Sequence, residues 1–317
     1  MERNELDKNA MGGTELMGAG LERHVNKELL SEFQIIRSRV RDIDESRKQV
    51  LWLHDLPGDP ESEHLRNPAS RNRFKKIVMV SNWQMQMYNA YLGVPYSDCV
   101  VLKNAIEPFK PEEINKDSGG KIKLIYHPTP HRGLNILVPV FDALCKKWGD
   151  KIQLDVYSSF KIYGWEERDR QFESLIQACK DHPQINYHGS VPNDVLRKAL
   201  GESHIFAYPS TWQETSCICA IEAMSASNLI VTPNLAALPE TTGGFAMMYQ
   251  YQEDLNAHAN LFYQQLDQAI DAVDRALTSE FEWDLARALN AQKAYADAMY
   301  NWKTRAAEWT QLLESLK

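Results

Sequence analysis

Short apolar runs alternate with longer amphipathic stretches along most of the chain, and this alternation limits the possible folds more than any other property. In the first third, four apolar runs are predicted to be strands: FQIIRSRV, QVLWLHDL, KIVMVSN and CVVLKN. Two stretches are predicted to be helices: GTELMGAGLERHVNKELL and WQMQMYNAYLG. Strands that alternate with helices are typical of βαβ units and of a parallel sheet.

A segment rich in proline, glycine and charge, PFKPEEINKDSGGK at residues 108–121, then interrupts the alternation and indicates a linker. After it, six further strands are predicted: KIKLIYH, IQLDVYS, INYHGS, HIFAYPS, NLIVTPN and FAMMYQ. Four helices lie between them: NILVPVFDALCKKWG, EERDRQFESLIQACKDH, PNDVLRKALGES and SCICAIEAMSAS. Two consecutive sets of this kind predict an α/β protein with two Rossmann-like doubly wound domains, with ligands at the carboxyl ends of the strands.

The domain organisation follows from the position of the linker. We predict a reduced N-terminal domain at residues 1–115 and a second domain at residues 120–280. C-terminal helices at residues 281–317 are predicted to cross back and pack on the N-terminal domain. In this tail, one buried helix face is indicated by the i, i+4, i+7, i+11 spacing of Trp302, Ala306, Trp309 and Leu313.

Composition excludes several classes of protein. The net charge of −8 and the pI near 5.6 imply no general polyanion-binding surface, which argues against a nucleic-acid partner without excluding it. The five cysteines form no CxxC pair and no zinc spacing, so we expect a reduced, cytoplasmic protein. The first ten residues, MERNELDKNA, lack the apolar core of a signal peptide. No run approaches ~20 apolar residues, so no membrane span is expected.

Two carboxylates, Glu214 and Glu222, stand eight positions apart in ETSCICAIEAM, just after the strand HIFAYPS. We expect Thr215, Ser216 and Cys217 in the first turn of a helix, where free N–H groups form an anion site. Glu222, about two turns on, would share the face of Glu214. Carboxylates accept two hydroxyl hydrogens at once, which suits sugar and ribose diols flanking a diphosphate. From spacing alone, an N-terminal acid and an unrelated surface glutamate explain the pair equally well.

The segment YPSTWQETSCICAIEAMSASNLIVTPNLAALPETTGG resembles the donor-binding segment of GT-B glycosyltransferases, particularly glycosyltransferase family 4 (group 1). In that family a strand ending in P-S precedes an E-x7-E motif, then E-A-M-A, another strand, and a P-E-x-x-x-x-G turn. The matching residues here are Pro209-Ser210, Glu214 and Glu222, Ala223-Met224-Ser225, and Pro239-Glu240 before Gly243-Gly244. The resemblance includes GSVPNDVLRKALGESHIFAYPS and KIKLIYHPTPHRGLNIL, spans most of residues 120–310, and covers the N-terminal part more weakly.

The resemblance implies roles for the residues of this segment. Glu214 would contact hydroxyls of the donor sugar, and Glu222 would hold the ribose of the nucleotide. The N–H groups of Thr215, Ser216 and Cys217 would approach sugar and phosphate. The family often has glycines after the first glutamate, whereas this chain has Thr-Ser-Cys, and a side chain there affects how closely the backbone approaches the donor.

The loop YHPTPHRGL matches the family's G-R-L-x-x-x-K-G loop. Arg132 fills the lysine position, where a fixed cation stabilises charge that builds on the leaving diphosphate. His127 fills the arginine position, and it could assist if protonated or as a neutral donor. A surface arginine in a turn is the alternative for Arg132. Base recognition in this fold depends on loop shape, here near Gly189 to Val191, so Val191 is a further candidate for donor binding.

The N-terminal half offers two further candidates. Gly12 and Gly13, in MGGTEL, open a helix, and similar glycine loops in the family face the diphosphate across the cleft. A cap or tight turn is the alternative. In the family a strand precedes this loop, but here only ten polar residues precede Met11. His54 ends an apolar strand, where family members often place a histidine beside donor sugar and acceptor; a buried or capping histidine explains it equally well. Asp55 could orient His54 or contact the acceptor.

The predicted activity is therefore transfer of a sugar from a nucleotide-sugar donor, UDP- or GDP-linked, to an unknown acceptor, glycan, lipid-linked or other. The resemblance implies retention of configuration, no cofactor and no metal ion. Asp42-Ile43-Asp44 forms a D-x-D, the metal signature of another glycosyltransferase fold, but it lies beside a basic run without the expected strand. Two alternatives remain: a sugar-nucleotide-binding protein without catalysis, and an isomerase like the sugar-nucleotide 2-epimerases.

Overall fold

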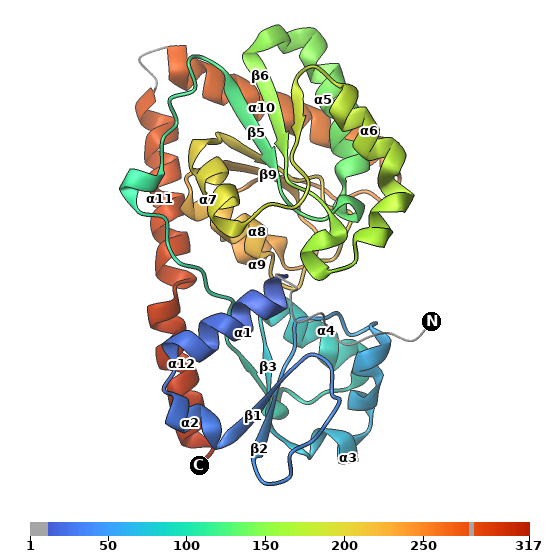
Figure 1. The fold of residues 1–317 in the computed structure, drawn as a ribbon, viewed down its shortest axis with the longest axis vertical. Helices are drawn as coiled ribbons and strands as arrows, with labels where there is room; N and C mark the ends of the chain where they lie inside the picture. Colours follow the sequence, from blue (N-terminus) through green and yellow to red (C-terminus); the bar gives the residue numbers. More distant parts are fainter. Residues whose placement is uncertain (1–11, 279–281) are drawn as a thin grey trace.

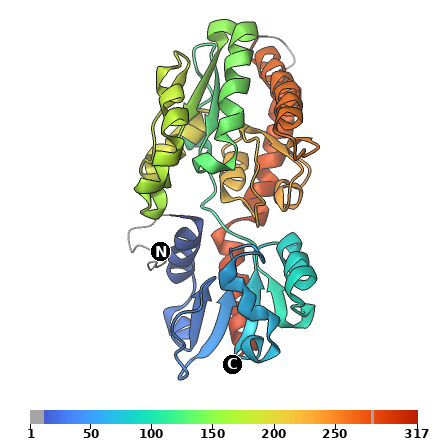
Figure 2. The same ribbon diagram turned by 90° about the vertical axis from the view of Figure 1, so that its right-hand side faces the viewer.

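The computed structural model describes residues 12–278 and 282–317, and it shows an elongated molecule built around two parallel sheets (Figures 1 and 2). The N-terminal sheet and its helices form the lower lobe in Figure 1, and the C-terminal sheet lies in the upper lobe. The α/β architecture predicted from the sequence is confirmed. The polar segment before Met11, for which no strand and no signal core were predicted, lies outside the described residues.

The N-terminal lobe contains a four-stranded parallel sheet in the order β1-β2-β3-β4. Its strands are β1 (Phe33–Arg37), β2 (Lys48–Trp52), β3 (Phe74–Met79) and β4 (Cys99–Val101). Its helices are α1 (Gly13–His24), α2 (Lys27–Ser31), α3 (Pro68–Arg71) and α4 (Asn82–Leu92), with short 3-10 turns at Pro60–Arg66 and Tyr96–Asp98. All four predicted strands are present.

One predicted helix of this lobe is divided. The stretch GTELMGAGLERHVNKELL forms α1 and α2 rather than a single helix. The break occurs because the side chain of Asn26 accepts hydrogen bonds from the backbone N–H groups of Glu28 and Leu29, which starts a new helix. Asparagine is among the preferred N-cap residues, so the local sequence stops α1 before its apolar pattern ends.

The C-terminal lobe contains a six-stranded parallel sheet in the order β10-β9-β8-β5-β6-β7. Its strands are β5 (Ile122–Tyr126), β6 (Ile152–Val156), β7 (Ile185–Tyr187), β8 (Ile205–Ala207), β9 (Leu229–Pro233) and β10 (Met247–Tyr249). The covering helices are α5 (Leu134–Trp148), α6 (Glu173–Asp181), α7 (Asn193–Glu202), α8 (Ile218–Ser225), α9 (Leu238–Thr242) and α10 (Leu255–Thr278). Because β5 pairs with both β6 and β8, the strand order reverses there.

Helices α9 and α10 are absent from the predicted elements. The sequence of α10 carries a helical period all the same, since Phe262, Leu266, Ala269 and Val273 are buried on one face. This face packs against α5 and against strands β9 and β10 of the upper lobe. Helix α9 is only five residues long, too short for its periodicity to show in the sequence.

Two helices at the end of the chain join the lobes. α11 (Glu282–Met299) packs on α8 of the upper lobe, and α12 (Trp302–Ser315) packs on α1 and α2 of the lower lobe. They form the long column on the left of Figure 1. Trp302, Trp309 and Leu313 are buried and Ala306 packs beside them, so the buried face predicted for the tail is confirmed.

The two lobes have separate apolar cores, and the chain crosses between them twice. The second crossing runs beside the first, because the N–H of Ile106 donates to the carbonyl of Tyr300 over 2.6 Å. The predicted domain boundaries at residues 115 and 280 stay predictions. Among the helices of residues 12–278 and 282–317, none combines the length and the apolar character that a membrane span requires.

Candidate functional site

Strands β5 and β8 lie side by side at the point where the order of the upper sheet reverses. In doubly wound sheets, the loops that leave such neighbouring strands diverge and open a crevice at their carboxyl ends. The loop after β5 carries His127 and Arg132, and the loop after β8 carries Glu214. The topology therefore brings together three of the residues singled out from the sequence.

Arg132 and Glu214 form a partly buried ion pair. Nη1 of Arg132 lies 2.7 Å from Oε1 of Glu214, whose residue is 6% exposed. The hydroxyl of Tyr208 donates to the same oxygen over 2.5 Å. Both bonds end on Oε1, so Oε2 has no hydrogen-bond partner among the residues that the structure describes. The guanidinium also lies 5.8 Å from the ring of Trp212.

Gly133 lets the loop after β5 approach the end of β8. Its backbone has φ +120°, a conformation that side chains rarely adopt, and an added Cβ would lie 2.2 Å from the carbonyl oxygen of Pro209. A larger residue would therefore push the two loops apart. Gly133 thus fixes the position of the neighbouring Arg132 against the segment that leads to Glu214.

The helix after Glu214 begins later than predicted. α8 starts at Ile218, with Cys217 as its N-cap, so Thr215 and Ser216 belong to the preceding loop and not to the first turn. Cys217 has φ +74°, in the left-handed region that glycine prefers. Here the chain adopts a glycine-like backbone without a glycine.

This start corrects the expected relation of the two glutamates. Glu214 lies outside the helix and Glu222 lies within it, so they do not share a helix face. The N–H groups of the first turn are those of Ile218, Cys219 and Ala220, of which that of Ala220 interacts with the thiol of Cys217. No side chain caps this turn. The anion site that was predicted at a helix N-terminus is therefore available, one turn further along the chain.

Glu222 is half-buried, and its carboxyl group has no hydrogen-bond or ion-pair partner within residues 12–278 and 282–317. Burial raises the pKa of this carboxyl to about 7, and Arg197 opposes the rise. Because this carboxylate has no partner, a ligand whose hydroxyl groups donate hydrogen bonds to it would stabilise its charged form. Its environment differs from that of Glu214, whose charge is already compensated by Arg132.

His127 is buried against the ring of Phe206, with ring centroids 5.0 Å apart. Burial lowers its pKa to about 3, so the imidazole is neutral at physiological pH. Its Nε2 is buried without a hydrogen-bond partner in residues 12–278 and 282–317. Of the two roles predicted for His127, the protonated one therefore does not fit, and the neutral one does.

The lower lobe contributes His54, which follows β2. Its carbonyl accepts a hydrogen bond of 2.9 Å from the hydroxyl of Thr215, across the gap between the lobes. Burial, with a smaller contribution from Arg37, lowers the pKa of the imidazole to about 3. Its Nε2 is buried and has no hydrogen-bond partner among the residues that the structure describes. Like His127, it presents a neutral ring with one unused nitrogen.

The N-terminus of α1 meets the N-terminus of α8. A Cβ on Gly13 would lie 3.0 Å from Cδ1 of Ile218, and a Cβ on Gly12 would lie 2.4 Å from the ring of Tyr163. Gly12 is the N-cap of α1, and among the described residues no side chain caps that helix. The N-terminal ends of two helices therefore approach each other from the two lobes (Figure 1). No sequence motif pointed to Tyr163.

Val191 lies apart from these residues in the fold. It is half-buried in the loop between β7 and α7, and β7 is the edge strand, separated from β5 by β6. Asp55 follows His54 and has a raised pKa, chiefly through burial and then through Asp59. Asp44 of the D-x-D bonds to Ser46 and Arg47. Among the described residues, no group of three or more His, Cys, Asp or Glu is placed to hold a metal ion.

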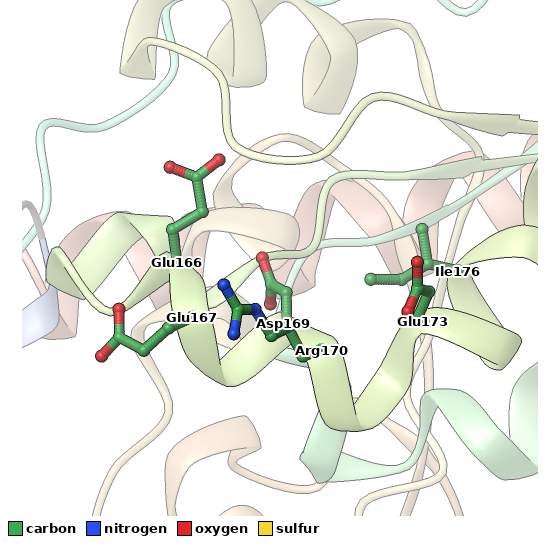
Figure 3. Close-up of a pocket in the computed structure, with 6 residues that line it drawn as sticks. All are labelled: Glu166, Glu167, Asp169, Arg170, Glu173 and Ile176. Atoms are coloured by element: carbon green, nitrogen blue, oxygen red, sulfur yellow. The ribbon is translucent and has the colours of Figure 1, made fainter.

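A separate hollow of about 360 Å³ lies along a 3-10 helix (Glu166–Phe172) and the start of α6 (Figure 3). Its lining is mostly acidic: Glu166, Glu167, Asp169, Arg170, Glu173 and Ile176. Asp169 has a structural partner, because its carboxylate accepts a 2.9 Å hydrogen bond from the N–H of Phe160. None of the residues predicted for the site lies in this hollow.

Comparison with known families gives one match that covers more than half of the chain. The model of the family described as "Glycosyl transferases group 1" matches residues 106–282. A relative in Saccharomyces cerevisiae, the GPI3 subunit of phosphatidylinositol N-acetylglucosaminyltransferase, is 24% identical over 165 residues. That alignment covers 49% of this chain and 35% of the yeast protein, so this chain matches only about a third of its relative's length.

Solved structures similar to this fold include a glycosyltransferase, the protein HepE and an O-GlcNAc transferase. A glycosyltransferase of Rickettsia africae has a TM-score of 0.68 at 16% identity and covers 100% of this chain and 84% of its own. HepE of Anabaena, solved with UDP-glucose, has a TM-score of 0.62 at 15% identity, and the match covers 85% of this chain and 72% of HepE. The pneumococcal O-GlcNAc transferase GtfA, solved with UDP and GlcNAc, has a TM-score of 0.66 at 11% identity, and the match covers 95% of this chain and 59% of GtfA. At these identities the similarity establishes the GT-B fold alone.

Proposed function

The chain belongs to the group 1 glycosyl transferases, and on that premise we propose that it transfers a sugar from a nucleotide-sugar donor to an acceptor. The donor would bind at the carboxyl edge of the upper sheet, where β5 and β8 part. The acceptor would approach from the lower lobe, past His54. The assignment to glycosyltransferase family 4 within this group stays a prediction.

The observation that carries the proposal is the meeting of two uncapped helix N-termini beside a fixed cation. The first turns of α1 and α8 both direct unused N–H groups and partial positive charge toward the gap between the lobes. Arg132 adds a guanidinium on the upper side, paired with Glu214. A diphosphate is a ligand that suits this field, and the field would stabilise the charge released when the sugar–phosphate bond breaks.

We assign the donor sugar to Glu214. Its Oε1 is held by Arg132 and Tyr208, which fixes the carboxylate, while Oε2 remains free to accept a sugar hydroxyl. The ribose is assigned to Glu222, whose unpartnered carboxyl suits a diol. The neutral ring of His127 would serve as a hydrogen-bond partner for donor phosphate or sugar. Backbone near Thr215, Ser216 and Cys217, and the loop at Val191, would complete the donor site.

In the lower lobe, Gly12 and Gly13 would allow the start of α1 to lie close to the diphosphate. The neutral imidazole of His54 would hydrogen-bond to a hydroxyl of the donor sugar or of the acceptor. We assign no protein nucleophile, and we propose retention of configuration by attack guided from the leaving phosphate. Because helix N-termini and Arg132 already supply positive charge, we propose that neither a cofactor nor a metal ion is required.

The solved relatives guide the choice of donor. Structures of HepE and GtfA hold UDP with glucose or GlcNAc, and the name of the yeast relative specifies N-acetylglucosamine as the transferred sugar. We therefore propose UDP-hexoses before GDP-hexoses. The acceptor class remains open between glycan and lipid-linked molecules. All five cysteines are unpaired, which suits the reducing cytoplasm that we propose as the site of action.

The proposal is tested by screening UDP-, GDP- and ADP-sugars for thermal stabilisation, and then for donor hydrolysis and transfer. A ligand that binds only the native state stabilises it, and the stabilisation grows with the logarithm of the ligand concentration divided by Kd. We expect stabilisation by UDP-sugars, and turnover that falls sharply in Glu214→Gln. Stabilisation without turnover across acceptors would favour the non-catalytic alternative, and an altered sugar without acceptor would favour the isomerase.

A further inference from the structure

The turn at Pro239-Glu240, which the sequence comparison singled out without a role, forms the short helix α9. Glu240 of this helix reaches across to the lower lobe. Its Oε1 accepts hydrogen bonds from the backbone N–H of Asn82 over 3.0 Å and from Nδ2 of Asn82 over 2.9 Å. Its Oε2 accepts from the N–H of Trp83 over 2.9 Å. One carboxylate of the upper lobe thus occupies the first turn of α4 in the lower lobe.

This arrangement is a helix cap supplied by the other lobe. The first N–H groups of a helix have no partner within it, and an anion beside them also interacts favourably with the helix dipole. The local cap of α4, Ser81, accepts only from the N–H of Gln84, which leaves those of Asn82 and Trp83 to Glu240. The hydroxyl of Ser81 donates instead to the carbonyl of Thr215, over 2.6 Å.

Helix α9 is also tied to the loop that carries the proposed donor residues. The N–H that precedes α9, at Ala237, donates to the carbonyl of Glu214 over 3.1 Å. The hydroxyl of Thr241 donates to the carbonyl of Ser216. On the other side, the hydroxyl of Tyr300, at the junction of α11 and α12, donates to the carbonyl of Thr241 over 2.9 Å. A single five-residue helix therefore contacts the donor loop, the crossing helices and the lower lobe.

We propose that Glu240 is a positioning residue for the transfer reaction: by capping α4 it fixes the lower lobe, and with it His54, in register with the donor loop. This inference rests on the proposed function. His54 belongs to the same register, because its carbonyl accepts the hydroxyl of Thr215. Domains joined by a linker move relative to each other unless their interface is extensive, so a few charged hydrogen bonds can decide the arrangement.

The experiment compares wild type with Glu240→Ala in kinetics and in hydrogen exchange of the peptide that contains Asn82 and Trp83. Loss of the charged cap should speed amide exchange at these two positions about 10-fold and lower kcat/KM about 10-fold. The loss should fall mainly on kcat, with the donor KM changed less than 3-fold, because Glu240 is not proposed to touch the donor. UDP-sugar should protect these amides in wild type and not in the variant.

A second variant removes the same bonds from the other side. Asn82 is the first residue of α4, a position that favours proline, and Ser81 has the extended backbone (ψ 160°) that a following proline requires. Asn82→Pro therefore deletes both bonds to Oε1 while keeping the helix. We expect a smaller loss than in Glu240→Ala. The double variant should lose no more than Glu240→Ala alone, because both changes act on one contact.

Glu253→Ala is the matched control, since Glu253 is an exposed glutamate of the same lobe with no hydrogen bond or ion pair to any described residue. It should change neither exchange nor turnover. Unchanged exchange at Asn82 and Trp83 in Glu240→Ala, or additive losses in the double variant, would overturn the positioning role. If the wild type transfers no sugar at all, the exchange measurement still tests the cap, while the proposed function fails separately.

Discussion

The two edges that face each other between the lobes differ in how their polar groups are satisfied. On the upper edge, Arg132, Glu214 and Tyr208 bond to one another, so charge and geometry are fixed before any ligand arrives. On the lower edge, the imidazole Nε2 of His54 is buried without a partner among the described residues, and no described side chain caps the N-terminus of α1; the upper edge shares these two features at His127 and at α8. What distinguishes the upper edge is therefore its preorganised ion pair of Arg132 and Glu214, whereas the histidine of the lower edge, His54, is neutral.

This difference indicates a division of labour. Preorganised charge is most effective where charge develops during the reaction, which places the leaving diphosphate on the upper edge. A neutral edge with unused nitrogen and N–H groups can adapt to an incoming hydroxyl. The upper edge is also the part that matches the family model, residues 106–282. The lower edge is therefore where we expect the identity of the acceptor to be determined.

The comparison is tested most severely by removing the charge of Glu214. We expect Glu214→Gln to lower kcat about 10²–10³-fold, the magnitude typical for loss of one preorganised electrostatic group. The amide keeps the size of the side chain and can still accept from Tyr208. Initial rates at saturating donor measure this effect. A loss of kcat below about 3-fold would show that Glu214 does not take part in the reaction, and the proposed difference between the two edges would then fail.

The next effect is on stability rather than rate. Arg132→Ala leaves the carboxylate of Glu214 buried without its counter-charge, which we expect to lower the free energy of unfolding by about 2–4 kcal/mol. Arg132 is itself partly solvent-accessible, at 22% of its side chain, so the effect should be near the lower end. Urea denaturation measures it. The double variant Arg132→Ala/Glu214→Gln should regain part of the lost free energy of unfolding. A double variant less stable than Arg132→Ala alone would contradict a stabilising ion pair between the two residues.

The lower edge should respond less. We expect His54→Ala to lower kcat/KM about 10–100-fold through one lost neutral hydrogen bond, with little change in donor affinity. The imidazole is neutral because burial lowers its pKa to about 3, so the rate should show no titration of His54 between pH 5 and 8. Steady-state kinetics with varied donor and acceptor separate the two constants. An effect confined to donor affinity would place His54 on the donor side instead.

The smallest effect concerns the pH dependence of donor binding. Folding raises the pKa of Glu222 to about 7 from an ordinary 4.5, so its ionisation in the native state costs stability, progressively as pH rises from about 4.5 to 7. Ribose hydroxyls favour the charged form. Affinity for a UDP-sugar should therefore increase up to about 10-fold between pH 6 and 8 in wild type. In Glu222→Gln, titration calorimetry should show an affinity that does not change with pH. The same pH dependence in the variant as in wild type would exclude Glu222 as the group that contacts the ribose.

Much of the fold follows from the sequence because its strands are buried in parallel sheets and appear as apolar runs. All six strands of the upper lobe, from Ile122 to Tyr249, are found this way. Three features escaped prediction: the break between α1 and α2, the short helix α9, and α10, which was missed although its sequence has a helical period. The side chain of Asn26 starts a new helix inside a continuous helical pattern, and α9 is too short to have a period.

The site residues that belong to a sequence motif could be predicted, whereas the contacts that depend on the three-dimensional arrangement of the chain could not. Glu214 and Arg132 come from loops 82 positions apart, and only the strand order brings them into an ion pair. The start of α8 was misplaced because Cys217 adopts a left-handed backbone, which nothing in a cysteine predicts. Tyr163 and Glu240 make contacts with distant parts of the chain; no local pattern identifies Tyr163, and the motif that contains Glu240 gave it no role.

The central claim is tested most directly by a crystal structure of the protein with a bound UDP-sugar. Our account predicts the diphosphate between the first turns of α1 and α8, within hydrogen-bond distance of Arg132 and of N–H groups at Ile218 to Ala220. The sugar should then reach Glu214, and the ribose Glu222. Nucleotide density away from the carboxyl ends of β5 and β8, with Arg132, Glu214 and Glu222 making no contact to the ligand, would contradict the account.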